Sequence, residues 1–181
     1  MDVSKERGII LKRNTSTIVL TGLFAAMITL MTAFIGHIPY GVHGGYIHFG
    51  DTLIYLAACL LPTPYALAAA AIGGGMADFL TAPMWAPATI IIKMLLVIPF
   101  TDKSGRLLCL RNVAASFAAA PVSIIGYYLA EGLLFGSFVA PAASVFGNIV
   151  QSAGSAILFF ILAVALEKAQ IKQRMGRLLN H

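Results

Sequence analysis

Charged side chains are scarce in this sequence of 181 residues. Only 10% of the residues are Asp, Glu, Lys or Arg, whereas 59% are hydrophobic and the mean hydropathy is +0.88. An ordinary soluble domain has about 25% charged residues. The scarcity of charge excludes an ordinary soluble domain and predicts an all-α integral membrane protein.

Cysteine is equally rare, because the sequence holds only Cys59 and Cys109. Both lie near the ends of apolar segments and no CxxC spacing is present. This excludes a disulfide-rich framework, so the two thiols are most simply small packing or lipid-facing residues.

The motifs that carry common enzyme chemistry are missing too. The sequence has no GxxxxGK[ST] phosphate loop, no HExxH and no GxSxG, and no acidic pair on adjacent helical turns. We therefore expect no enzyme, no catalytic residue and no cofactor. A chain with no nucleotide site and no inverted repeat would need a partner to drive uphill transport.

The basic residues that are present give a net charge of +5, but they flank apolar stretches. That placement is typical of membrane topology determinants rather than of a nucleic-acid-binding surface. Eleven of the twelve lie in three places: Lys5, Arg7, Lys12 and Arg13; Lys103, Arg106 and Arg111; and Lys168, Lys172, Arg174 and Arg177. The twelfth, Lys93, lies inside an apolar segment.

Six apolar segments form a single membrane domain over residues 1–181, with no internal repeat. The first begins after about fourteen residues and lacks an evident cleavage site, so we expect a retained helix. The predicted helices are 15–35, 50–61, 64–80, 88–101, 112–134 and 141–167.

An even number of helices places both termini on one side of the membrane, together with the internal basic loop. The three loops on the opposite face carry no Lys or Arg. The prediction is six transmembrane helices with cytoplasmic termini. The second and fourth helices are short for a ~30 Å hydrocarbon core, so they either extend into loops or line a cavity.

Polar side chains gather in the outer half of these helices. An ionisable group inside a membrane normally faces a bundle interior or an aqueous cavity. A cation, acids, amides and aromatics at one depth predict a pocket for a small polar molecule. The candidate substrate-binding residues on helices are Asp78, Lys93, Tyr127, Glu131, Asn148 and Gln151.

Structural roles for the same residues stay open. Asp51, at the start of the second helix, is as readily a helix N-cap. Lys93 could form an ion pair with Asp78 or Glu131 and have no substrate role. Asn148 and Gln151 lie three residues apart on one helix face and could instead bond neighbouring helices.

The first outer loop, residues 36–49, is rich in glycine and aromatic residues. It could cover the pocket as a lid, and Tyr46 and His43 are candidate ligand contacts. An interfacial aromatic belt is the alternative. His37, His43 and His48 could hold a transition metal, but the partners expected at regular spacing are absent, so no metal site is predicted.

Small residues on the first helix mark a possible docking face. Gly22 and Ala26 form one stripe, and Thr21, Ala25 and Thr29 form the adjacent one. Such stripes allow close helix approach in membranes, either with a partner or with helices of the same chain.

Several stretches, in this order and spacing, resemble the substrate-binding S-components of energy-coupling-factor (ECF) vitamin transporters. They are Tyr46-Ile47-His48-Phe49-Gly50-Asp51, the turn Pro62-Thr63-Pro64, GGGMADFL, APMWAPAT and the run Ile90 to Lys93.

The resemblance implies a multi-pass protein of a prokaryotic cell membrane that captures a vitamin or precursor outside. A transmembrane coupling (T) protein and two cytoplasmic ATPases would drive import. Family members contact the coupling protein through an AxxxA-type motif, matched here by Gly22 and Ala26. Their ligand contacts come from the first outer loop and the outer halves of the fourth to sixth helices, and nickel and cobalt members use an N-terminal His motif that this sequence lacks.

The leading hypothesis is therefore a vitamin-binding S-component. We expect a small aromatic heterocycle, held by stacking and by hydrogen bonds from both a cation and an acid. A pyridoxine-like or thiamine-precursor ligand suits this mixed polarity, whereas a flavin is large for it. The alternatives are a structural or assembly membrane protein, and a metal-binding S-component that uses the loop histidines.

Overall fold

The computed structural model describes residues 3–35, 37–39, 46–139 and 141–180, and they are mostly helical. The helices are α1 (Val3–Ala33), α2 (Asp51–Leu60), α3 (Thr63–Thr81), α4 (Ala86–Val97), α5 (Leu110–Phe135), α6 (Pro141–Lys168) and α7 (Ile171–Asn180). A 3-10 turn (Pro83–Trp85) precedes α4, and β1 (Ile38–Pro39) pairs antiparallel with β2 (Tyr46–Ile47).

Three helical segments in the described chain are long and apolar enough to cross a membrane: Thr15–Ala33, Leu110–Phe135 and Ser144–Lys168. Asp51–Leu60 and Pro83–Val97 are apolar but shorter. The all-α membrane class is thus confirmed, whereas six spans and their sidedness stay predictions.

The helices differ from the predicted segments in several places, among them α4, which spans Ala86–Val97 rather than 88–101. α1 begins at Val3 rather than near residue 15, so its basic end is helical. α2 stops at Leu60 because Leu61, which precedes Pro62, is held in an extended conformation. The sequence analysis missed α7, which carries basic residues and is too polar to register as an apolar segment.

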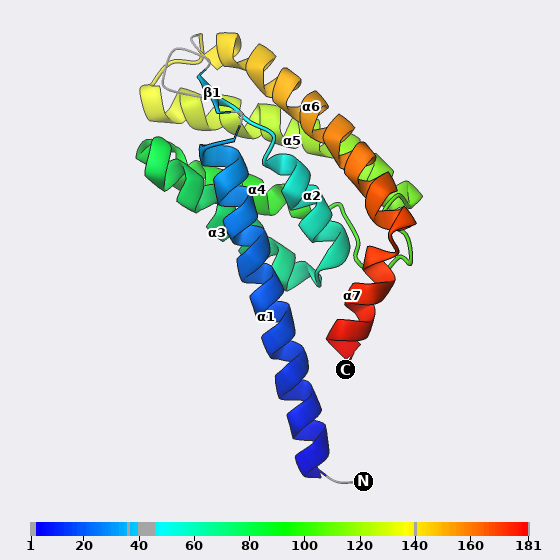
Figure 1. Cartoon of the computed structure of the whole chain (residues 1–181). Helices are drawn as coiled ribbons and strands as arrows, with labels where there is room; N and C mark the ends of the chain where they lie inside the picture. The colour runs from blue at the N-terminus through cyan, green and yellow to red at the C-terminus, as the bar shows by residue number, and fades with distance from the viewer. Residues whose placement is uncertain (1–2, 36, 40–45, 140, 181) are drawn as a thin grey trace.

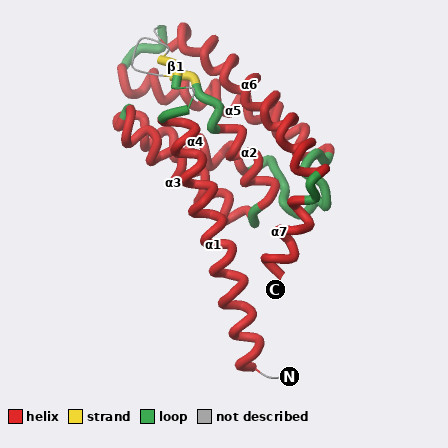
Figure 2. Tube along the Cα trace, viewed as in Figure 1, coloured by secondary structure: helices red, strands yellow, loops and turns green. Residues whose placement is uncertain are grey.

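α2 occupies the middle of the molecule and packs against α1, α3, α4 and α6 (Figure 1). α5 and α6 run side by side, and α7 packs against α1 and α6. The β1–β2 hairpin lies at one end of the molecule, and both chain ends lie at the other (Figure 2). The short second helix is therefore a central element rather than a lipid-facing one.

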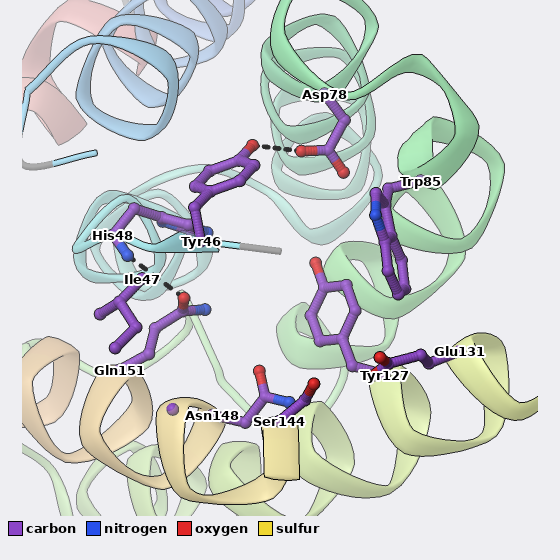
Figure 3. Close-up of a pocket in the computed structure, with 11 residues that line it drawn as sticks. Tyr46, Ile47, His48, Asp78, Trp85, Tyr127, Glu131, Ser144, Asn148 and Gln151 are labelled. Carbon is purple, nitrogen blue, oxygen red and sulfur yellow. Dashed lines mark hydrogen bonds between the residues drawn. The ribbon is translucent and has the colours of Figure 1, made fainter. Parts of the chain in front are cut away.

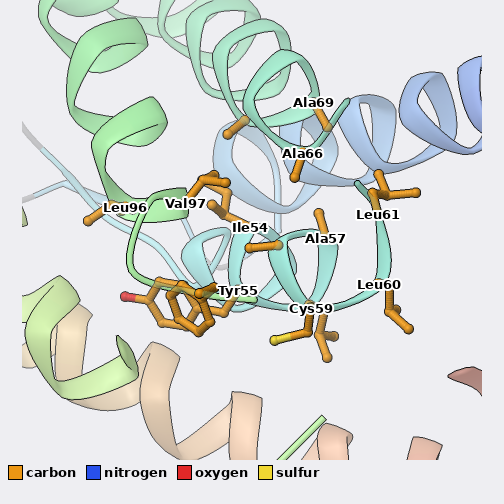
Figure 4. Packing of buried hydrophobic residues seen from close by; sticks show 14 of the residues in the cluster. Ile54, Tyr55, Ala57, Cys59, Leu60, Leu61, Ala66, Ala69, Leu96 and Val97 are labelled. Atoms are coloured by element: carbon orange, nitrogen blue, oxygen red, sulfur yellow. The ribbon is translucent and has the colours of Figure 1, made fainter. Parts of the chain in front are cut away.

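The apolar core surrounds α2 (Figure 4). Tyr55 stacks on Phe100 with ring centroids 5.1 Å apart and meets Phe159 edge to face at 5.9 Å. In contrast, large apolar side chains on the outer helices face outward, such as Leu133 at 77% and Ile157 at 60% exposure. An apolar exterior around a packed core is what a lipid environment requires.

Two consecutive glycines bring the helices around α3 close together. A Cβ at Gly73 would lie 2.7 Å from Cβ of Ile28 on α1. A Cβ at Gly74 would lie 2.8 Å from Cγ of Lys93 on α4. The glycine run therefore allows close packing on both sides of α3 and makes room for the Lys93 side chain.

Candidate functional site

A cavity opens beside the β1–β2 hairpin (Figure 3). The space between its walls, counted out through its open mouth into solvent, is about 570 Å³. It is bordered by β2, α3, the 3-10 turn, α5 and α6. The lining residues are Tyr46, Ile47, His48, Asp78, Trp85, Tyr127, Glu131, Ser144, Gly147, Asn148 and Gln151.

Most of the candidate residues meet at this cavity, although they come from distant parts of the sequence. Six of them line it: Tyr46, Asp78, Tyr127, Glu131, Asn148 and Gln151. Lys93 does not line it, and His43 lies outside the described residues. Whether the lining residues contact a ligand stays a prediction.

Tyr46 of β2 connects the hairpin to α3. Its hydroxyl donates a hydrogen bond to Oδ1 of Asp78, and the Thr81 hydroxyl lies 3.3 Å from the same tyrosine oxygen. Burial and the nearby Asp78 charge raise the pKa of Tyr46, so its phenol keeps its proton. The His37 ring stacks on Tyr46 with a centroid distance of 3.9 Å.

Gln151 of α6 connects the chain after β2 to the start of α2. Its Oε1 accepts a hydrogen bond from the His48 backbone N–H at 3.3 Å. Its Nε2 donates to Oδ2 of Asp51 at 3.2 Å. The Gln151 side chain is buried, at 2% exposure, and borders the cavity. The same side chain also holds the segment from His48 to Asp51 in place.

The imidazole of His48 is held in its neutral form. Its Nδ1 accepts the Gly50 backbone N–H at 3.0 Å, which leaves the ring proton on Nε2. Burial, reinforced by the Lys93 charge, lowers the pKa of His48 to about 3. His48 therefore brings no positive charge to the cavity at neutral pH.

Lys93 forms an ion pair that the sequence analysis did not predict. Its Nζ lies 2.6 Å from Oδ1 of Asp51, with the two side chains 1% and 0% exposed. We expected Asp78 or Glu131 as its partner, but in the structure the partner is Asp51. Asp51 makes no capping hydrogen bond from its side chain at the start of α2, because it faces α4 and meets Lys93 there.

Trp85 and Tyr127 form the aromatic part of the wall. Their rings meet edge to face with centroids 6.3 Å apart, and the Tyr127 and Thr89 hydroxyls lie 3.0 Å apart. Lys93 lies behind this wall, with its Nζ 5.3 Å from the centroid of the Tyr127 ring. The ammonium is thus one side chain removed from the cavity.

The sequence analysis missed two lining residues that carried a usable signal. Trp85 is the only tryptophan and lies in the APMWAPAT stretch, in the 3-10 turn between α3 and α4. Ser144 lies four residues before Asn148, so it extends the Asn148 and Gln151 face by one turn. The arrangement can stack an aromatic ring and hydrogen-bond its substituents.

The two small-residue stripes on α1 have different surroundings. Thr21 and Ala25 are buried, and the Thr29 hydroxyl lies 3.1 Å from the backbone oxygen of Gly73 on α3. Gly22 and Ala26 are exposed, and a Cβ at Gly22 would meet nothing within 4 Å. The Gly22 and Ala26 stripe is therefore the one open to another molecule.

The metal-binding alternative gains no support from the described chain. Within it, no three His, Cys, Asp or Glu side chains form a group that could hold a metal ion.

Comparison with known proteins gives two matches. A family model described as the S component of an ECF-type riboflavin transporter matches residues 12–168. An uncharacterised protein of Pyrococcus woesei is 28% identical over 144 residues, which cover 76% of this chain and 93% of that protein.

Proposed function

This chain belongs to the family of S components of ECF-type riboflavin transporters, and we propose that it captures a small vitamin or vitamin precursor for import. A transmembrane coupling protein and two cytoplasmic ATPases supply the energy. The cavity beside the hairpin carries this proposal, because aromatic, acidic and amide side chains from five elements converge on it.

The proposed orientation places this cavity on the outside of a prokaryotic cell membrane. The chain ends lie at the opposite end of the molecule (Figure 1), and eleven of the twelve Lys and Arg residues belong to the two terminal regions, to the loop before α5 or to the first turn of α5. The described segments 46–50, 82–85 and 136–139, near the cavity, contain no Lys or Arg. Six spans with cytoplasmic termini satisfy this bias.

The proposed substrate is a single-ring aromatic heterocycle, such as a pyridoxine-like molecule or a thiamine precursor. Trp85 and Tyr127 offer aromatic surfaces, and the carboxylates and amides around them offer hydrogen-bond partners for ring substituents. The volume of about 570 Å³ includes the open mouth, so the enclosed part favours a small ligand. Riboflavin is the second candidate, because the family description names it.

The coupling protein is proposed to dock on the exposed Gly22 and Ala26 stripe of α1. This stripe has room for a close helix approach and lies on the apolar face that includes Val19 and Leu23. Substitution by a large side chain would hold the two proteins apart without touching the cavity.

Uptake measurements test the proposal. Cells or vesicles that contain this chain, its coupling protein and both ATPases should take up the vitamin that the isolated chain binds. Gly22→Leu and Ala26→Leu should abolish uptake and leave the Kd of the purified chain unchanged. Ala118→Leu, at an exposed position on α5, is the matched control and should transport normally.

A structural or assembly role is the competing outcome. It predicts no saturable ligand, and loss of folding rather than of binding when buried charges are changed. Uptake that survives both α1 substitutions would place the docking face elsewhere.

A further inference from the structure

We propose that the cavity selects its ligand by charge: it accepts neutral or positively charged heterocycles and rejects phosphorylated or carboxylated ones. The inference rests on the proposed function and sharpens it, because it divides vitamins and their derivatives into two chemical classes. It also replaces the sequence-based expectation that a cation and an acid both hold the substrate.

The charges on the cavity wall have one sign. Asp78 and Glu131 both border it, and each is almost completely buried, at 4% and 2% exposure. Asp78 also accepts a hydrogen bond from the Tyr46 hydroxyl. Among the described residues that line the cavity there is no Lys or Arg.

The remaining lining group that can titrate near neutral pH is held neutral. His48 Nδ1 accepts the Gly50 backbone N–H, so protonation of the ring at Nδ1 would break this hydrogen bond. Gln151 and Asn148 contribute amides, which carry no charge. Among the described residues that line the cavity, the acids Asp78 and Glu131 are therefore the only carriers of a formal charge.

The one buried cation nearby is already neutralised. Lys93 Nζ lies 2.6 Å from Asp51, and Gln151 donates a second hydrogen bond to the other oxygen of that carboxylate. An anionic ligand would have to separate this pair and leave Asp51 buried without its cation, which is unfavourable. Lys93 therefore offers no counter-charge to a phosphate or carboxylate.

The mouth of the cavity does not compensate. The described segments 46–50, 82–85 and 136–139 contain no Lys or Arg, so neither type of side chain is present in them to attract an anion. A protonated amine or a cationic ring nitrogen gains instead from the two carboxylates. It also gains from the π-faces of Trp85 and Tyr127, which Figure 3 shows on the same side of the cavity as Asp78 and Glu131.

Two sets of probes that change charge at one position test this inference. The first set is pyridoxamine, pyridoxine and 4-pyridoxate, which differ only at ring position 4. That position carries a protonated aminomethyl group, a hydroxymethyl group and a carboxylate, respectively. In the second, riboflavin is compared with its phosphate. Binding is followed by equilibrium dialysis, and by the fluorescence of Trp85, the only tryptophan and a lining residue.

In whichever set binds, the neutral or cationic member should bind at least tenfold more tightly than the anion, which corresponds to about 1.4 kcal/mol. An anion that binds as tightly as its neutral counterpart overturns the inference and leaves the proposed function intact. If the chain binds none of the five probes and no other vitamin, the proposed function is contradicted, and the inferred charge selectivity fails with it.

A matched pair of variants locates the effect. Glu131→Gln should reduce the preference for the neutral or cationic probe at least threefold. Glu167→Gln makes the same change on α6, where the carboxylate accepts the Leu108 backbone N–H away from the cavity, and should leave the preference unchanged. If Glu131→Gln does not fold, Asp78→Asn tests the second wall charge, and an unchanged preference in the folded variant counts against the inference.

Discussion

Asp51 and Glu131 are both buried carboxylates in the half of the molecule near the hairpin, at 0% and 2% exposure, yet their surroundings differ. Asp51 lies against Lys93 and joins α2 to α4, away from the cavity surface. Glu131 borders the cavity together with Asp78. Burial alone therefore does not distinguish the positions of these two acids; the contact of Asp51 with Lys93 and the place of Glu131 at the cavity do.

The largest expected effect comes from breaking the Asp51–Lys93 pair. Lys93→Ala leaves Asp51 buried without its cation and should lower the free energy of unfolding by about 3–5 kcal/mol. Denaturation of the purified protein in detergent measures this loss.

The double variant Asp51→Asn, Lys93→Met is the control for that loss. It removes both charges, so it should be more stable than Lys93→Ala alone. A Lys93→Ala protein that keeps its stability but no longer binds ligand would make Lys93 a ligand contact and overturn the contrast.

The next largest effect concerns the aromatic wall. Trp85→Leu removes one of the two aromatic rings at the cavity and should weaken binding about tenfold or more. Because Trp85 is buried against Tyr127 and Phe135, the variant should also lose stability, so binding is measured on the folded fraction. Isothermal titration calorimetry measures the Kd, since this variant lacks tryptophan. Phe79→Leu, at a 65% exposed position on α3, should bind like the wild type.

A smaller effect is expected at the hairpin. Tyr46→Phe removes the hydroxyl that donates to Asp78 and should speed ligand release about three- to tenfold, because one contact that holds β2 at the cavity wall is lost. Stopped-flow fluorescence of Trp85 measures the dissociation rate. Tyr65→Phe, on α3 within the apolar core, is the control and should leave that rate unchanged.

The smallest effect is a pH dependence of stability from His48. Its pKa is lowered in the folded protein from 6.5 to about 3, so the unfolded chain binds the additional proton between these values. Stability is then complete above pH 6.5 and falls as the pH drops, by about 1 kcal/mol between pH 7 and 5.5. Thermal unfolding at both pH values measures it.

His48→Asn is the matched variant, because the asparagine oxygen can accept the Gly50 N–H as Nδ1 does. It should remove this share of the pH dependence. If the stability of His48→Asn falls between pH 7 and 5.5 as much as that of the wild type, other titratable groups cause the pH dependence.

The sequence predicted those parts of the site that depend on spacing within one helix. Asn148 and Gln151 were placed on one face of α6 because they lie three residues apart, and both line the cavity. The apolar runs likewise predicted the long helices, whereas α7 was missed because its residues are largely polar.

Contacts between distant segments could not be predicted in the same way. Lys93 and Asp51 are 42 residues apart, and Asp51 and Gln151 are 100 apart. Their pairing depends on where the first turn of α2 lies among the other helices. It also depends on the close approach that Gly74 allows beside Lys93. Hydrophobic periodicity reports neither of these, so Lys93 was assigned to the ligand site rather than to the core.

The central claim is that the cavity between the hairpin, α3, α5 and α6 is a ligand site. Titration of the purified chain with riboflavin, pyridoxine and a thiamine-precursor pyrimidine, followed by Trp85 fluorescence, tests it most directly. The account predicts saturable binding of one molecule per chain, with a Kd below about 1 µM for at least one of them. The absence of saturable binding by these compounds and by the remaining vitamins would contradict it.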